Sequence, residues 1–93
     1  MPKEFTSRPS YPDPLKLSGI EFELPEDGRV TLKIFDNSGV EVRTVIDKQE
    51  YKAGKHTIEL KATDYANGVY FYRLSAECDG KSFTDTKRLA ITR

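Results

Sequence analysis

The stretch Asn67-Gly68-Val69-Tyr70-Phe71-Tyr72-Arg73-Leu74 decides the fold class of this 93-residue chain. It opens on an Asn-Gly dipeptide, which is typical of a turn that leads into a strand. After the turn, large side chains alternate between two faces, as they do along a β-strand. One face carries Tyr70, Tyr72, Leu74 and Ala76, and the other carries Val69, Phe71 and Arg73. The stretch therefore predicts a long strand whose first face packs into a core.

The same two-residue period recurs in shorter segments on both sides of this stretch. Turn-forming Pro, Gly, Asp and Asn occupy residues 25–28, 36–39 and 78–81, and the Asp-Gly pair at 79–80 is a hairpin signal. These segments predict further antiparallel strands joined by tight turns. Their inward positions are Ile20, Phe22 and Leu24, then Val30, Leu32 and Ile34, and finally His56, Ile58 and Leu60.

Two segments depart from the regular pattern. The parity of the apolar positions changes between Val42 and Val45, which predicts a bulge or an early strand end there. The polar run that follows, residues 47–54, predicts a longer loop. In the last segment Asp85 and Lys87 share the parity of the apolar residues, so we expect part of that strand to face water or to bend.

The spacing of these segments predicts an all-β fold. No segment has apolar residues at helical spacing over three turns, and six or seven short strands favour an immunoglobulin-like antiparallel β-sandwich. With one cysteine and no tryptophan, the chain lacks the hallmarks of antibody domains. Residues 1–19 hold four of the five prolines and predict an extended Pro-rich linker that leads into a single domain of residues 20–93.

Charge and composition narrow the class of function. Fifteen basic and fifteen acidic side chains give no cationic surplus, so nucleic acid is not an expected partner. No apolar run approaches the ~20 residues of a membrane span, and the N-terminal residues lack a signal-peptide core. An exported domain with this sequence is therefore expected to be one piece of a longer precursor. The single cysteine, Cys78, excludes an internal disulfide.

The ordered set of motifs resembles the C-terminal sorting domain of type IX secretion, also called the Por secretion system. The set covers about residues 11–93, and related alternation occurs in the Ig-like domain of flagellar hook-capping proteins. That relative usually carries a Trp-Asp-Gly motif where this chain has Leu60-Lys61-Ala62, so the sorting domain is the better match. Asp13, Leu15, Ala90 and Thr92 depart from the usual sorting-domain pattern. The matching motifs are Tyr11-Pro12-Asp13-Pro14, Ile20-x-Phe22-x-Leu24-Pro25, Gly28-x-Val30-x-Leu32-x-Ile34-x-Asp36-x-x-Gly39, Ala53-Gly54-Lys55-His56-Thr57, Asn67-Gly68-Val69-Tyr70-x-Tyr72-x-Leu74 and Thr86-Lys87-x-Leu89.

This resemblance implies an address label attached to the end of a large secreted cargo such as a hydrolase, an adhesin or a protease. In the family the domain crosses the inner membrane with its cargo, folds in the periplasm and is read by the outer-membrane translocon. Sortase-like components then often cleave it, and the cargo stays outside the cell or on its surface. The resemblance places the recognised surface on the last strand and its neighbour, at Gly68, Tyr70, Lys87, Arg88, Leu89 and Ile91.

A structural interpretation of these residues stands beside the functional one. Leu89 and Ile91 fit a core, while Lys87 and Arg88 fit the charges that keep an edge strand soluble. An exposed last strand can also add to another sheet, so weak self-association through this edge is expected of an isolated domain.

The residues that catalysis needs are missing from the pattern. His56 is the only histidine and lies on an apolar face, where a packed residue at the edge of the core is expected. There is no nucleophile elbow and no glycine-rich phosphate loop. The carboxylates fall mainly in turns, where they cap backbone amides, and no spacing predicts a metal site. We therefore expect neither an enzyme nor a cofactor.

The alternative is an accessory module of an extracellular hydrolase, either a spacer or a carbohydrate-binding domain. Sugar binding needs flat, exposed aromatic rings, and Tyr51, Tyr65 and Phe71 are the candidates. The competing expectation is that Phe71 faces a second layer and that the two tyrosines sit singly on loops. A spacer requires no special residues at all.

Overall fold

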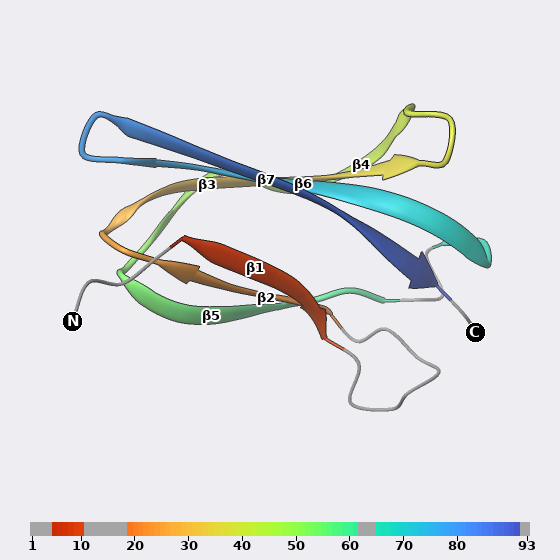
Figure 1. The fold of residues 1–93 in the computed structure, drawn as a ribbon, viewed down its shortest axis with the longest axis horizontal. Helices are drawn as coiled ribbons and strands as arrows, with labels where there is room; N and C mark the ends of the chain where they lie inside the picture. Colours follow the sequence, from red (N-terminus) through yellow and green to blue (C-terminus); the bar gives the residue numbers. More distant parts are fainter. Residues whose placement is uncertain (1–4, 11–18, 62–64, 92–93) are drawn as a thin grey trace.

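The computed structural model describes residues 5–10, 19–61 and 65–91. These residues form two antiparallel sheets stacked face to face, with no helix (Figure 1). The predicted all-β sandwich is confirmed. The three-stranded sheet has the order β1 (Thr6–Ser10), β2 (Gly19–Leu24), β5 (Gly54–Glu59). The four-stranded sheet has the order β4 (Glu41–Tyr51), β3 (Gly28–Asp36), β6 (Gly68–Cys78), β7 (Lys81–Ile91).

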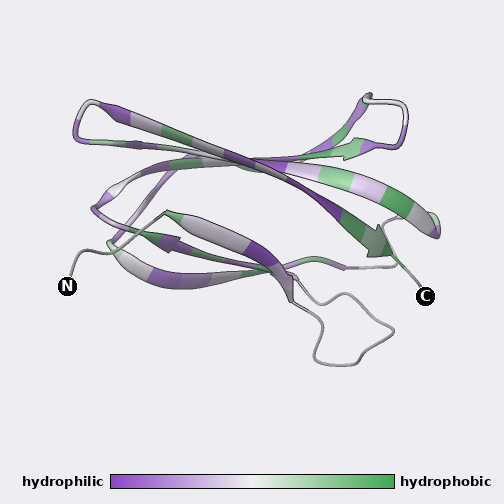
Figure 2. Cartoon of the chain, viewed as in Figure 1, coloured by the Kyte–Doolittle hydropathy of each residue, from purple (hydrophilic) through white to green (hydrophobic). Residues whose placement is uncertain are grey.

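The core lies between the sheets and follows from the two-residue alternation. In β6 the predicted inward residues Tyr72 and Leu74 are fully buried, and they oppose Ile34 and Leu32 of β3 in register. The three-stranded sheet covers them with the alternate residues of β2. Figure 2 shows apolar and polar residues alternating along these strands. Each fully buried aliphatic or aromatic side chain contributes about 1.5–3 kcal/mol to the hydrophobic driving force.

The two tight hairpins carry the turn chemistry that the sequence predicts. Cys78 pairs with Lys81 across a two-residue turn, in which Asp79 and Gly80 both have positive φ angles of 50° and 78°. This is the geometry that favours Asp-Gly in hairpins. In the β3–β4 hairpin, Asp36 Oδ1 accepts hydrogen bonds from the Ser38 amide at 2.9 Å, the Ser38 hydroxyl at 2.6 Å and the Val40 amide at 3.0 Å.

The β3–β4 pair contains the predicted irregularity but not the predicted loop. Its register shifts at three places, which confirms the bulge expected near Val45. The loop predicted over residues 47–54 is wrong, because β4 continues to Tyr51 and pairs there with Gly28. β4 is an edge strand, so it keeps its backbone paired on one side while its polar side chains face water.

The prediction of a linker over residues 1–19 is wrong for Thr6–Ser10. These residues form β1 and pair with β2 from Thr6–Glu23 to Ser10–Gly19. Pro9 is accommodated because β1 is an edge strand, where a missing amide leaves one side of the ladder intact. The motif expected to lead into the domain, residues 11–14, and Leu15 lie outside the described residues. Apart from β1, the predicted division of the chain between residues 19 and 20 stays a prediction.

A substitution at Gly28 tests how closely the start of β3 packs against the end of β6. A Cβ atom placed there would lie 2.4 Å from the Glu77 carbonyl oxygen and 2.6 Å from Cys78 Sγ. We therefore expect Gly28→Ala to lower the unfolding free energy by about 1–3 kcal/mol, since neither neighbour can move freely. The exposed neighbour offers the control, and Arg29→Ala should stay within about 0.5 kcal/mol of the wild type in urea denaturation. Equal midpoints for the two variants would contradict the tight contact.

Asp36 gives the β3–β4 turn a dependence on pH. The Ser38 hydroxyl, followed by the Val40 amide, lowers the pKa of the Asp36 carboxyl below 3.8. Because the folded pKa is the lower one, the stabilisation is complete above the unfolded pKa and is lost as the pH falls through the folded pKa. Asp36→Asn keeps the acceptor oxygen but does not titrate. Urea melts between about pH 5 and pH 2 should show a smaller loss of stability for this variant than for the wild type. Parallel pH profiles would count against this role.

Candidate functional site

The last strand, β7, lies at one edge of the four-stranded sheet. It pairs with β6 along its whole length, from Cys78–Lys81 to Gly68–Ile91. No other strand of the described residues pairs with its outer edge. In an antiparallel ladder, residue pairs that exchange backbone hydrogen bonds alternate with pairs that do not. The alternation is counted here from Cys78–Lys81, the pair that flanks the two-residue turn. The backbone groups of Ser82, Thr84, Thr86 and Arg88 therefore face this open edge.

The six predicted recognition residues come together at one end of the β6–β7 pair. Gly68 opposes Ile91, Tyr70 opposes Leu89, and the next two pairs along the ladder contain Arg88 and Lys87. Tyr70, Leu89 and Ile91 are only 9%, 2% and 1% exposed. These three side chains belong to the core, so the accessible members of the group are Gly68, Lys87 and Arg88.

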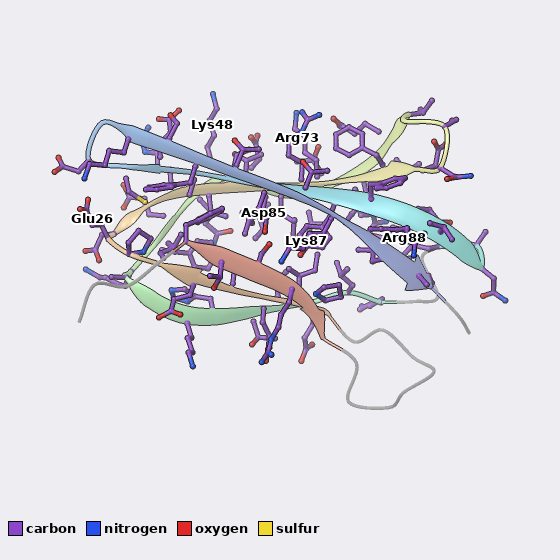
Figure 3. All side chains as sticks on the ribbon, viewed as in Figure 1. Glu26, Lys48, Arg73, Asp85, Lys87 and Arg88 are labelled. Atoms are coloured by element: carbon purple, nitrogen blue, oxygen red, sulfur yellow. The ribbon has the colours of Figure 1, made fainter. Side chains whose placement is uncertain are left out.

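Lys87 and Asp85 point from β7 into the space beside β1 (Figure 3). The Lys87 ammonium donates a hydrogen bond to the Ser7 carbonyl oxygen, and its Nζ lies 3.6 Å from Asp85 Oδ2. The Ser7 hydroxyl donates to that same carboxylate. The Tyr72 hydroxyl lies 3.0 Å from Ser7 Oγ and, with the serine hydrogen already used, donates to it. The expected exposure holds for Lys87, whose side chain is 44% exposed, and both charged residues also make a polar contact with β1.

Ser7 takes part in this polar contact, and the sequence does not predict its position there. Ser7 is 3% exposed, and among the described residues it is the one polar residue that is buried. The only sequence signal for a buried polar partner is the shared parity of Asp85 and Lys87 with apolar residues. That signal does not say which segment supplies the partner.

Arg88 lies on the opposite face of β7 and is exposed. It opposes Phe71 in register, and Phe71 in turn opposes Phe35 of β3. The Arg73 guanidinium lies over the Phe35 ring at 4.9 Å from its centroid. Two cations, Arg73 and Arg88, therefore flank a half-buried aromatic pair on the outer face of the sheet.

The three aromatic residues suggested for sugar binding lie in three different places. Tyr51 is half-buried and packs edge-on against Phe22 at 5.4 Å, and burial raises the pKa of its hydroxyl. Tyr65 is 7% exposed and packs on the Tyr70 ring at 5.7 Å. Phe71 lies on the outer face of the four-stranded sheet. Buried Tyr65 has no free ring face, so these residues form no flat platform for a sugar.

His56 packs at the edge of the core, as predicted. Its ring lies 5.3 Å from Phe22 and 5.0 Å from Tyr51, and its Nε2 lies 2.6 Å from the Lys52 carbonyl oxygen. That nitrogen carries the hydrogen, because a carbonyl oxygen can only accept. The buried Cys78 thiol contacts the Glu26 carbonyl oxygen at 3.6 Å, and its pKa is raised by burial and by the Glu26 charge.

Ligand pockets and metal sites find little support in the described part of the chain. A hollow of about 550 Å³ lies near the β6–β7 turn. Its lining is mainly charged and includes the ion pairs Lys52–Asp27 at 3.8 Å and Arg29–Glu50 at 4.0 Å. Small-molecule sites are usually lined by apolar side chains. Among the described residues, no group of three or more His, Cys, Asp or Glu is placed to hold a metal ion. None of these residues belongs to a helix with the length and apolarity that a bilayer crossing requires.

The comparisons with known proteins give one match. A family model described as a secretion system C-terminal sorting domain matches residues 10–91. The match covers all strands from β2 to β7. Neither a curated protein nor a solved structure matches the chain significantly.

Leu89 and Arg88 are adjacent in β7 but lie on opposite faces of the strand, so their substitution distinguishes the buried face from the accessible one. Leu89→Ala removes a side chain that is 2% exposed and should lower the unfolding free energy by about 2–4 kcal/mol. Arg88→Ala removes an exposed side chain and should change it by no more than about 0.5 kcal/mol. Chemical denaturation of the two variants and the wild type measures both values. A large loss in Arg88→Ala would mean that this residue supports the fold.

Proposed function

Because the chain belongs to the family of secretion system C-terminal sorting domains, we propose that the type IX translocon reads it at β7 and the chain end. Membership makes the domain a sorting signal of type IX secretion within a longer precursor. It also implies a protein that is secreted or displayed at the cell surface. The finer steps are part of the proposal: transit through the periplasm, contact with the translocon and with sortase-like components, and a cargo domain that precedes residue 1.

The open edge of β7 is the observation that carries this proposal. Backbone groups of four residues face outward, and no strand of the described chain pairs with them. An extended segment of a partner protein can add to such an edge through main-chain hydrogen bonds. Exposed charge next to the added strand then sets its register and speeds association. Among the described residues, Arg88 is the exposed cation nearest the end of this edge.

The candidate residues divide into two roles in this proposal. Tyr70, Leu89 and Ile91 hold β7 in place through the core, and their substitution acts through folding. Arg88 contacts the translocon directly, while Gly68 keeps the neighbouring β6 terminus free of a side chain. Lys87 is accessible only in part, because Ser7 engages its ammonium. Weak self-association through the same edge stays a prediction.

We also propose that the domain itself performs no catalysis and needs no cofactor. The family is one of sorting signals and not a catalytic one. The scattered aromatic residues give sugar binding no support. A spacer role requires only the fold, and it is the alternative that export must exclude.

A reporter export assay tests the role of Arg88. Residues 1–93 are fused behind a fluorescent protein with an inner-membrane signal peptide, in a bacterium with type IX machinery. A deletion of residues 87–93 would remove core residues of β7, so point variants are sharper. We expect Arg88→Gln to reduce external reporter by roughly fivefold, as for loss of one interface charge. The matched control is Lys48→Gln, which removes an exposed charge from β4, the opposite edge of the same sheet.

The outcomes of this assay separate the proposals. Reduced export in Arg88→Gln with normal export of the control supports recognition at β7. Equal export of both variants assigns recognition elsewhere on the domain. Retention of the folded wild-type fusion inside the cell would leave the spacer as the better account.

A further inference from the structure

Strand β1 supplies no apolar residue to the buried core of the described chain. It pairs with β2 on one side and contacts β7 of the other sheet on the other. The buried apolar residues come from β2, β3, β4, β6 and β7 and from residues 60 and 65, and none comes from β1 or β5. β5 supplies the partly buried Ile58. Pro9 also removes one backbone donor from this five-residue strand. Apolar burial therefore contributes less to holding β1 than to holding β2, β3, β4, β6 or β7.

What holds β1 to β7 is a short row of side-chain contacts, which we call the seam: Phe5–Phe83, Ser7–Asp85 and Ser7–Lys87. Phe5 stacks on Phe83 with ring centroids 5.4 Å apart and planes 23° from parallel. Ser7 then exchanges hydrogen bonds with Asp85 and Lys87 as described above. Alternate residues of the two strands meet, so the seam is a regular contact between two strand faces.

If β1 were removed, a groove would be left between the edge of β2 with which β1 pairs and the inward face of β7. The groove offers backbone groups from β2, an aromatic ring from Phe83, and a carboxylate and an ammonium from Asp85 and Lys87. Its occupant is therefore an extended segment with an aromatic residue followed two positions later by a small hydroxyl residue. Phe5-x-Ser7 has this chemistry.

We propose that β1 is a releasable strand, and that its docking in this groove withholds Lys87 from any partner of β7. In the docked state the Lys87 ammonium is bound to the Ser7 carbonyl oxygen, and its side chain is 44% exposed. In the released state Lys87 is free and the β2 edge is unpaired, while the core between β2, β3, β5, β6 and β7 stays closed. The link to translocon recognition rests on the proposed function, whereas the release of β1 does not.

Docking of β1 and binding at Lys87 are reciprocal by thermodynamic linkage. A change that weakens β1 must expose Lys87, and a change that removes the Lys87 charge must loosen β1. Each direction can be measured on the isolated full chain, without export machinery. Failure of the proposal is thereby distinguishable from failure of the sorting role.

Hydrogen exchange followed by mass spectrometry tests the first direction. Lys87→Met keeps the length and apolar stem of the side chain but removes its bond to Ser7. We expect exchange of the β1 amides to become about tenfold faster, while β3 and β6 stay protected. Arg88→Met is the matched control on the opposite face of β7 and should leave β1 unchanged. Unchanged β1 exchange in Lys87→Met, or loss of protection in β1, β3 and β6 together, would overturn the proposal.

The rate of lysine acetylation tests the second direction. Phe5→Ala removes the ring that stacks on Phe83 but touches neither Ser7 nor Lys87 directly. We expect Lys87 to be acetylated at least about threefold faster in this variant, with exposed Lys48 of the same chain as the internal reference. An unchanged ratio of the two rates would show that β1 does not shield Lys87, and would refute the proposal.

Discussion

The register between β3 and β6 is the constraint on which the rest of the structure depends. It places three opposed pairs on the inward face, and no member of them is more than 1% exposed: Val30–Ala76, Leu32–Leu74 and Ile34–Tyr72. Because side chains alternate along a strand, a slip of one residue would turn all of them to solvent. β4 and β7 attach to the two sides of this central pair, and the smaller sheet closes over it. The edge strands can therefore carry polar and charged residues without endangering the core.

The sequence was sufficient for the strands with one buried face and insufficient for the others. β2, β3 and β6 alternate between apolar and polar residues, and the turns at residues 36–39 and 79–80 join β3 to β4 and β6 to β7. β1 and the second half of β4 have no such alternation, because an edge strand can be held by backbone pairing alone. Local composition then indicates a linker or a loop. Only the partner strand, distant in sequence, determines that these segments are extended and paired.

The candidate site was predictable in place but not in detail. The turn at residues 79–80 implied that β7 follows β6, so the six residues named for recognition had to meet at one end of the pair. These six residues differ in burial because successive residues of a strand face opposite sides of the sheet. Leu89 faces the core, and its neighbour Arg88 faces solvent. The contact of Ser7 with Asp85 and Lys87 spans almost the whole chain and leaves no local signal. Charges that point inward from an edge strand are also a known defence against unwanted sheet extension, so the same pair protects β7 while holding β1.

The burial of Cys78 has a practical consequence. Its sulfur is fully buried at the end of β6, against the backbone of Gly28 and the Glu26 carbonyl oxygen. Its raised pKa also keeps the sulfur in the unreactive thiol form. An alkylating reagent can attack only while the β6–β7 hairpin stands apart from the turn before β3. The rate at which this thiol is alkylated in a fixed excess of reagent therefore reports how often that end of the sandwich opens. The measurement needs no added label.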